Sequence, residues 1–222
     1  MNSPLAAQVL NSRLFLDWKE KVVANGNRLE SVETLAVVSR NGRDIYSALL
    51  DCELLTPEGY RLKRCMMLRG PSVAIIPLLK CEGRVFTALV RQRRIVDGDF
   101  SLEFAGGGSQ RDNLLSDALN ELLEETGISV KPDELIPLNA KPVKVCESLL
   151  DEVVSFFYFE KDLTRVELGR LQDSSAGVHS AGEFTRVVVM PFDEVIRIHG
   201  FQVMAAMSLL ARAKEGIFSE KN

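Results

Sequence analysis

The sequence lacks the marks of secreted, zinc-binding and membrane proteins. Its four cysteines form no CxxC pair and no zinc-ligand spacing, which favours reduced thiols. The opening MNSPLAAQVLNSR has no basic start followed by an apolar stretch, so it predicts no signal peptide. The most apolar runs, 73–79 and 203–211, fall far short of the roughly 20 residues that span a bilayer. We therefore expect a soluble, cytoplasmic protein that does not contact membranes.

Concentrated positive charge is also missing. The chain has 27 Lys and Arg against 31 Asp and Glu, a net charge of -4. Its one dense basic stretch, RQRR at 91–94, is too short for a nucleic-acid surface, so no nucleic-acid partner is expected. The only histidines, His179 and His199, are not at ligand spacing with each other, and we expect both to be structural or exposed.

The remaining composition is that of an ordinary globular protein. The chain has 222 residues, of which 46% are hydrophobic and 26% charged, enough for one domain with an extension. Apolar residues at helical spacing predict a helix over 12–25, with Ser12 as its cap and Gly26 as its stop. Two turn signals, Asn41-Gly42 and Pro57-Glu58-Gly59, then predict a small antiparallel β unit over about 30–68.

A second β-rich block begins at Ser72, with two strands that meet at a turn near Glu82-Gly83. The glycine-rich segment EFAGGGS then leads into a helix over about 113–126. Further strands are predicted at 153–159 and 184–190, and a C-terminal helix at about 192–214. Helices that flank a mostly β core indicate an α/β sandwich.

The helix at 113–126 carries a cluster of carboxylates. An apolar stripe docks one side on a sheet, and the acidic residues fall on the other: Asp117, Glu121, Glu124 and Glu125. Residues 121 and 125 lie one turn apart, so their carboxylates can approach within roughly 5–6 Å. Hard cations such as Mg²⁺ take carboxylate oxygens and bind through substrate phosphates. The alternative is an ordinary solvated face, with Gly127 as a helix C-cap.

Residues 106–128 resemble the Nudix box, G-x5-E-x7-R-E-U-x-E-E-x-G-U, where U is aliphatic. Gly106 takes the first position, and the stretch from Glu121 to Ile128 matches the end of the pattern in register. Two positions depart from it. Asp112 stands where the pattern has glutamate, and Asn120 stands where it has arginine. In the family these two side chains form a salt bridge that braces the loop and helix, and an Asp–Asn hydrogen bond could replace it.

The flanking segments resemble the ADP-sugar diphosphatase and ADP-ribose pyrophosphatase branch of this superfamily. They appear in the same order along almost the whole chain: FLDWKEKVVANG, RGPSVAIIPLL, VRQRR, LEFAGG and GEFTRVVVMPFDEV. The resemblance implies a Nudix α/β/α sandwich with a mixed sheet at 69–222. It also implies an N-terminal helix and antiparallel β extension at 1–68, which helps to form a homodimer and contributes to the substrate pocket.

The resemblance also implies a metal site in the box. Glu121 and Glu125 match metal ligands, and Glu124 matches a further ligand or a catalytic carboxylate of the surrounding shell. The backbone carbonyl of Ala105 matches one that completes the metal shell. The expected cofactor is Mg²⁺, with Mn²⁺ as the alternative.

Other implied site residues lie outside the acidic helix. In ESLLDEVV, the pair Asp151-Glu152 matches an acidic pair of the branch, so Glu152 is the candidate base or a third-site ligand. The alternative is a surface acidic pair before a strand. Arg94 and Glu103 are expected to face the substrate. For them the alternative is an ordinary ion pair and a strand-end carboxylate. The glycines Gly106 and Gly107 are assigned to substrate binding.

The function implied first is Mg²⁺-dependent hydrolysis of a nucleoside diphosphate sugar, with ADP-sugar or ADP-ribose favoured, to a nucleoside monophosphate and a sugar phosphate. A second reading, favoured by the altered box, is a sensor that binds nucleotide-sugars with weak or no turnover. A plain α/β interaction domain is the third, and it leaves the full-length resemblance unexplained.

Overall fold

The computed structural model describes residues 4–39, 44–96, 98–109, 112–172, 174–176 and 185–214. The chain divides into two compact units. The first comprises Met1–Pro71 with Lys144–Val153, and the second comprises Ser72–Val143 with Val154–Asn222. Residues 144–153, which lie inside the predicted 69–222 domain, thus pack with the N-terminal segment.

The first unit is a three-stranded antiparallel sheet with two helices, in the strand order β1-β2-β3. Its elements are α1 (Pro4–Val9), α2 (Arg13–Ala24), β1 (Arg28–Ser39), β2 (Ile45–Leu55) and β3 (Arg61–Leu68). The predicted helix at 12–25 is confirmed, because the Ser12 hydroxyl accepts a hydrogen bond from the Phe15 N–H at 3.2 Å. Gly26 follows the helix at φ 79°, and Gly59 turns the β2–β3 hairpin at φ 88°. The predicted Asn41-Gly42 turn lies outside the described residues.

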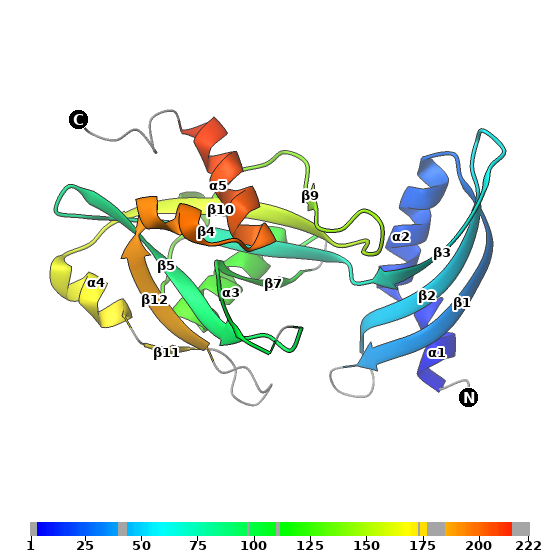
Figure 1. The fold of residues 1–222 in the computed structure, drawn as a ribbon, viewed down its shortest axis with the longest axis horizontal. Coiled ribbons are helices and arrows are strands. Elements are labelled where there is room, and N and C mark those ends of the chain that lie inside the picture. The colour runs from blue at the N-terminus through cyan, green and yellow to red at the C-terminus, as the bar shows by residue number, and fades with distance from the viewer. Residues whose placement is uncertain are drawn as a thin grey trace. The chain divides into compact units, whose positions relative to one another are not determined.

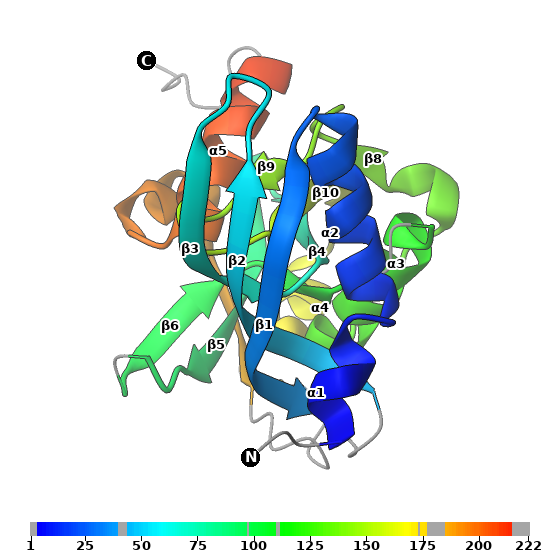
Figure 2. The same ribbon diagram turned by 90° about the vertical axis from the view of Figure 1, so that its right-hand side faces the viewer.

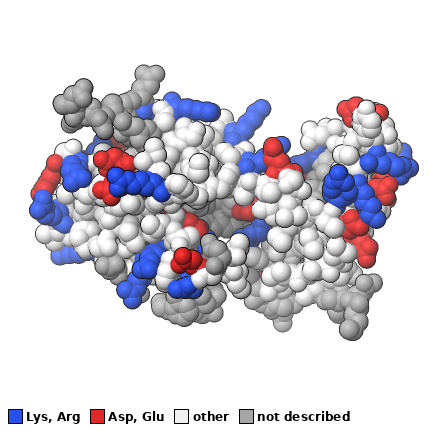
Figure 3. Space-filling model, in the orientation of Figure 1, with Lys and Arg blue, Asp and Glu red and all other residues white. Residues whose placement is uncertain are grey.

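One face of this sheet packs an apolar core, and the strands also carry charged side chains. Helix α2 lies along the apolar face (Figures 1 and 2), where its Phe15 and Trp18 pack with Leu50, Cys52 and Leu68. Ion pairs link charged side chains of the strands. Arg28 pairs with Glu30 within β1, and Arg61–Glu53 and Lys63–Asp51 join β3 to β2. On the face shown in Figure 3, acidic and basic side chains alternate over this unit instead of forming a basic patch.

The second unit contains a nine-stranded mixed sheet and is an α/β sandwich, as predicted. The main strand order is β11-β12-β5-β4-β10-β8, with β6 beside β5, β7 beside β4 and β9 beside β10. The strands are β4 (Pro71–Cys81), β5 (Arg84–Arg93), β6 (Phe100–Glu103), β7 (Ala105–Gly108), β8 (Ile136–Pro137), β9 (Val143–Lys144), β10 (Val153–Asp162), β11 (Ser175–Ala176) and β12 (Thr185–Pro191).

Helices cover both faces of this sheet (Figure 1). They are α3 (Leu114–Thr126), the 3₁₀ helices η1 (Pro132–Glu134) and η3 (Phe192–Arg197), α4 (Arg165–Leu171) and α5 (Phe201–Ala213). Alternate residues of β5, Ala88 and Val90, pack in one core with Leu122 of α3 and Leu168 of α4. Leu89, which points the other way, is fully buried as well, so the opposite face is also covered.

The prediction of one continuous C-terminal helix at 192–214 is wrong. The segment is two helices, η3 and α5, separated by extended residues. Ile198 has φ -90° and ψ 120°, and Gly200 has φ -89° and ψ 141°, both outside the helical region. Gly200 then serves as the N-cap of α5. In the described part of the chain, no helix is long and apolar enough to cross a membrane.

Candidate active site

Helix α3 is held against the sheet by its apolar stripe. Ala118 and Leu122 are fully buried and pack with Ala88, Val90 and Val187. Gly127 ends the helix in the left-handed conformation at φ 71°, and its N–H donates to the Leu123 carbonyl at 2.9 Å. The acidic side of the helix is therefore fixed relative to the glycine-rich strand β7, which contacts α3 directly.

Glu125 is the buried carboxylate of this helix. Glu125 is only 7% exposed, and its Oε2 atom accepts a hydrogen bond from the Gly106 N–H at 2.9 Å. The preceding residue, Ala105, is fully buried and pairs with Ile75 across strands β4 and β7. The N–H of the Ala105–Gly106 peptide thus bonds Glu125. In a trans peptide the carbonyl points opposite to the N–H, so the role of the Ala105 carbonyl as a metal ligand stays a prediction.

Glu121 lies one turn before Glu125 and beside Gly107. A Cβ atom built on Gly107 would lie 2.2 Å from the Glu121 Oε1 atom. A side chain at 107 would therefore occupy the space that the Glu121 carboxylate fills. Two carboxylates of one helix, Glu121 and Glu125, consequently converge on two successive glycines, Gly106 and Gly107.

Glu124 is placed differently from these two. It is exposed, as expected for a residue on the outer side of the helix. Among the described residues, no group of three or more His, Cys, Asp or Glu side chains could hold a metal ion. The arrangement is thus a pair of carboxylates beside two glycines, and the role predicted for Glu124 stays a prediction.

Arg94 and Glu103 contact each other across the β5–β6 hairpin. The Arg94 Nε donates to Glu103 Oε1 at 2.8 Å, and its terminal nitrogen pairs with the other carboxylate oxygen. Ser101 Oγ donates to Glu103 Oε1 at 2.5 Å. Burial acts to raise the pKa of Glu103, but its bonds to Arg94 and Ser101 outweigh this effect and lower the pKa from its ordinary value. Glu103 is therefore an ionised partner of Arg94.

Glu152 belongs to the first unit, within Lys144–Val153. It is half-buried, and its backbone carbonyl accepts a hydrogen bond from the Val145 N–H at 3.2 Å. His199 is exposed. His179 lies outside the described residues.

Comparison with known proteins supports the resemblance. No family model matches the chain. It is 24% identical to Nudix hydrolase 14, chloroplastic, of Arabidopsis thaliana over 230 residues, which cover 96% of this chain and 74% of that protein. Its fold is similar to a crystal structure of an ADP compounds hydrolase, with a TM-score of 0.57 and 16% identity over 86% of this chain and 95% of that chain. The chain is thus similar to a Nudix hydrolase over almost its whole length. The similarity supports a hydrolase.

A second contact joins the loop before α3 to that helix. Asn120 is exposed on α3, and its hydrogen bond to Asp112 stays a prediction. The Ser109 hydroxyl donates to Asp117 Oδ2 at 2.6 Å. This bond joins the loop after β7 to the first turn of α3, the same two elements that the salt bridge joins in the family.

Sequence reasoning missed Ser109 and Ser101 as functional-site neighbours. Ser109 and Asp117 are eight residues apart, and that spacing matches no capping motif. Ser101 bonds Glu103 two residues along a strand, where both side chains lie on one face. The spacing of two residues along a predicted strand could therefore have pointed to Ser101 as a neighbour of Glu103.

Proposed function

We propose that this Nudix protein hydrolyses the diphosphate of a nucleoside diphosphate sugar, with ADP-sugar or ADP-ribose favoured, in the presence of Mg²⁺ or, alternatively, Mn²⁺. The products are a nucleoside monophosphate and a sugar phosphate. The observation that carries the proposal is the carboxylate pair of Glu121 and Glu125 against Gly106 and Gly107. Like charges one helical turn apart destabilise each other, so the pair favours a bound cation.

The donor set fits a magnesium ion. Mg²⁺ is usually held by one or two carboxylates, and water and substrate phosphates supply its other ligands. Glu121 and Glu125 provide the two carboxylates, and the Ala105 carbonyl is proposed as a further ligand by resemblance. A cluster of three carboxylates is therefore not required. When bound, the cation would offset the negative charge of the diphosphate.

The residues of the chain then have separate tasks. Glu121 and Glu125 would hold the cation. The absence of side chains at Gly106 and Gly107 leaves room for strand β4 and for the Glu121 carboxylate, and the two glycines are proposed to contact the substrate. Water attacks one phosphorus of the diphosphate, and the bond from that phosphorus to the bridging oxygen breaks. Glu152 accepts the proton of the attacking water as general base, and the second phosphate leaves. Glu124, exposed on α3, is the further carboxylate of the site.

The Arg94–Glu103 pair is the proposed contact to the substrate. Because Glu103 already occupies the guanidinium, a phosphate or sugar hydroxyl that binds Arg94 would compete with that carboxylate or share the Arg94 fork with it. Arg94 is about half exposed, so part of its side chain stays accessible.

Assembly into a homodimer through the first unit is part of the same proposal. This unit exposes apolar side chains on its strands, among them Leu35, Val38 and Leu62. Light scattering from the purified protein should give about twice the 24.7 kDa mass of one chain. A mass of one chain at micromolar concentration would contradict this arrangement.

The decisive experiment is a panel of nucleoside diphosphate sugars incubated with purified protein and Mg²⁺, with products identified by mass spectrometry. Glu125→Gln should abolish hydrolysis, since it removes a ligand charge at constant size. Glu20→Gln is the matched control, because Glu20 is an exposed glutamate on another helix, α2. No turnover of any substrate, together with measurable binding of one, would contradict the hydrolase and leave the sensor as the function.

A further inference from the structure

The loop that carries Glu152 is attached to the end of strand β3. The Met67 N–H donates to the Leu149 carbonyl at 2.7 Å, and the Asp151 N–H donates to the Met67 carbonyl at 3.3 Å. Met67 and Leu150 form a parallel bridge. The segment therefore runs beside β3 like a short additional strand, although about 80 residues separate the two in sequence.

The Asp151 side chain holds the turn that follows β3. Its Oδ1 accepts hydrogen bonds from the backbone N–H groups of Arg69, at 2.6 Å, and Gly70, at 3.0 Å. Gly70 has φ 80°, and a Cβ there would lie 2.5 Å from the Leu14 side chain, so only glycine fits this turn. The turn thus presents two neighbouring N–H donors to one oxygen of the Asp151 carboxylate.

The loop is also closed on itself. The N–H groups of Leu149 and Leu150 both donate to the Cys146 carbonyl, at 3.2 and 2.9 Å, and the Val145 N–H donates to the Glu152 carbonyl. The backbone of Glu152 is therefore fixed by Asp151 on one side and by Val145 across the loop. Without the Asp151 side chain, the backbone bonds at Met67 would still join the loop to β3.

We propose that Asp151 is the positioning residue of the reaction: it anchors the loop to the β3 turn and so gives the neighbouring base, Glu152, one backbone position. This inference rests on the proposed hydrolase, in which Glu152 is the base. Asp151, the first of the two acidic residues, binds the protein backbone, and Glu152 is left for proton transfer.

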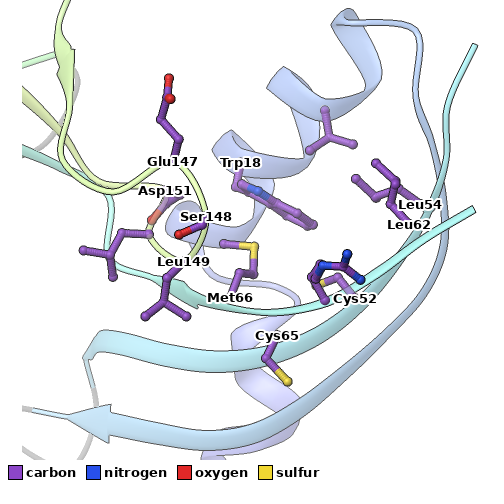
Figure 4. Close-up of a pocket in the computed structure, with 13 residues that line it drawn as sticks. Trp18, Cys52, Leu54, Leu62, Cys65, Met66, Glu147, Ser148, Leu149 and Asp151 are labelled. Carbon is purple, nitrogen blue, oxygen red and sulfur yellow. The ribbon is translucent and has the colours of Figure 1, made fainter.

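A cavity in the first unit supplies a direct readout of the loop. It has a volume of about 250 Å³ and lies between α2, strands β2 and β3, and the loop. Trp18 forms one wall, and Ser148, Leu149 and Asp151 form the facing wall (Figure 4). Trp18 is the only tryptophan of the chain, so its emission reports whether the loop is in place.

The experiment compares Asp151→Ala and Asp151→Asn with wild type and with Glu147→Gln. Glu147 is on the same loop, but its carboxylate forms a solvent-exposed ion pair with Lys144. Asp151→Ala should shift Trp18 emission to longer wavelength, speed amide exchange at Arg69 and Gly70, and lower kcat by about tenfold or more with a smaller change in KM. Asp151→Asn should be intermediate, because an amide oxygen still accepts both bonds, and Glu147→Gln should match wild type.

Two outcomes would overturn the inference. One is wild-type emission and exchange in Asp151→Ala, which would show that the loop is held without the carboxylate. The other is a released loop with unchanged kcat, which would show that the anchor does not position the base. Failure of the hydrolase itself is separately visible, since wild-type protein would then turn over no substrate while emission and exchange still report the anchor.

Discussion

Two adjacent glycines, Gly106 and Gly107, meet different kinds of neighbours. A Cβ on Gly106 would lie 2.2 Å from the backbone carbonyl oxygen of Val73, whereas a Cβ on Gly107 would lie 2.2 Å from the Glu121 carboxylate. Backbone in a paired strand cannot move aside, but a side chain can rotate. The same substitution at the two positions should therefore affect different properties.

Gly106→Ala should destabilise the fold, and Gly107→Ala should mainly reduce activity. Overpacking against β4 is expected to cost about 1–3 kcal/mol of unfolding free energy at 106. At 107 the displaced Glu121 should lower kcat by about tenfold or more, with little change in melting temperature. Thermal denaturation and steady-state kinetics of both variants check this. Equal losses of stability at the two positions would contradict the distinction.

The cysteines differ at the same scale. Burial, with smaller contributions from Asp51 and Cys65, raises the pKa of the Cys52 thiol to about 11. Cys146 is partly exposed, and its hydrogen bonds with Ser148 lower the pKa of its thiol. Because the thiolate is the reactive form, the lower pKa gives Cys146 the larger reactive fraction at neutral pH.

Alkylation at pH 7.5 should accordingly label Cys146 well before Cys52. Labelling of Cys52 should remain slow until the pH approaches 11 or the protein unfolds. Peptide mapping by mass spectrometry over a time course gives both rates, with urea-unfolded protein as the control in which the two rates converge. Faster labelling of Cys52 in native protein would contradict the assignment.

At the scale of elements, helix α5 begins without a side-chain cap. Gly200 is its N-cap, no side chain caps the first N–H groups, and the first turn contains no acidic residue. A Cβ at Gly200 would meet nothing within 4 Å, and its φ of -89° suits any residue. The position can therefore accept a capping side chain.

Gly200→Asp should raise the unfolding free energy by about 0.3–1 kcal/mol. The carboxylate would accept bonds from the first turn, and the unfolded chain would lose glycine's freedom. Urea denaturation measures the change. Gly200→Ala is the matched control, since it changes backbone freedom without adding a cap, and equal stability of the two variants would argue against capping.

The elements that the sequence predicted are those whose signals are local. The Ser12 cap, the Glu82-Gly83 turn and the apolar stripe of α3 each depend on residues within one or two turns. The break at 198–200 was missed because apolar residues continue on both sides of it. The Ser109–Asp117 and Asp151 contacts were missed because side chains that bond distant backbone leave no periodic pattern. The family resemblance points to Asp112 and Asn120, and the Ser109–Asp117 bond is a further contact between the same loop and helix.

At the scale of the whole molecule, two units with separate cores should not unfold as one. Trp18, the tryptophan of the chain, belongs to the first core, so tryptophan emission follows the unfolding of the first unit. Far-ultraviolet circular dichroism follows the helices and strands of both units. Multidomain chains commonly depart from two-state behaviour.

Urea titration followed by tryptophan emission and by far-ultraviolet circular dichroism should therefore give different midpoints. A destabilising Leu50→Ala substitution in the first core should move the emission midpoint more than the dichroism midpoint. Coincident curves in wild type and variant would show that the two cores are coupled into one cooperative unit.

The first unit takes its material from two separate stretches of the chain, Met1–Pro71 and Lys144–Val153. A ribosome must therefore synthesise more than seventy residues of the second unit before the first can be completed. Until residue 151 emerges, the Arg69 and Gly70 donors lack the carboxylate that binds them. The N-terminal unit of a nascent chain should thus mature late, and a fragment cut at Pro71 should be an unfinished domain.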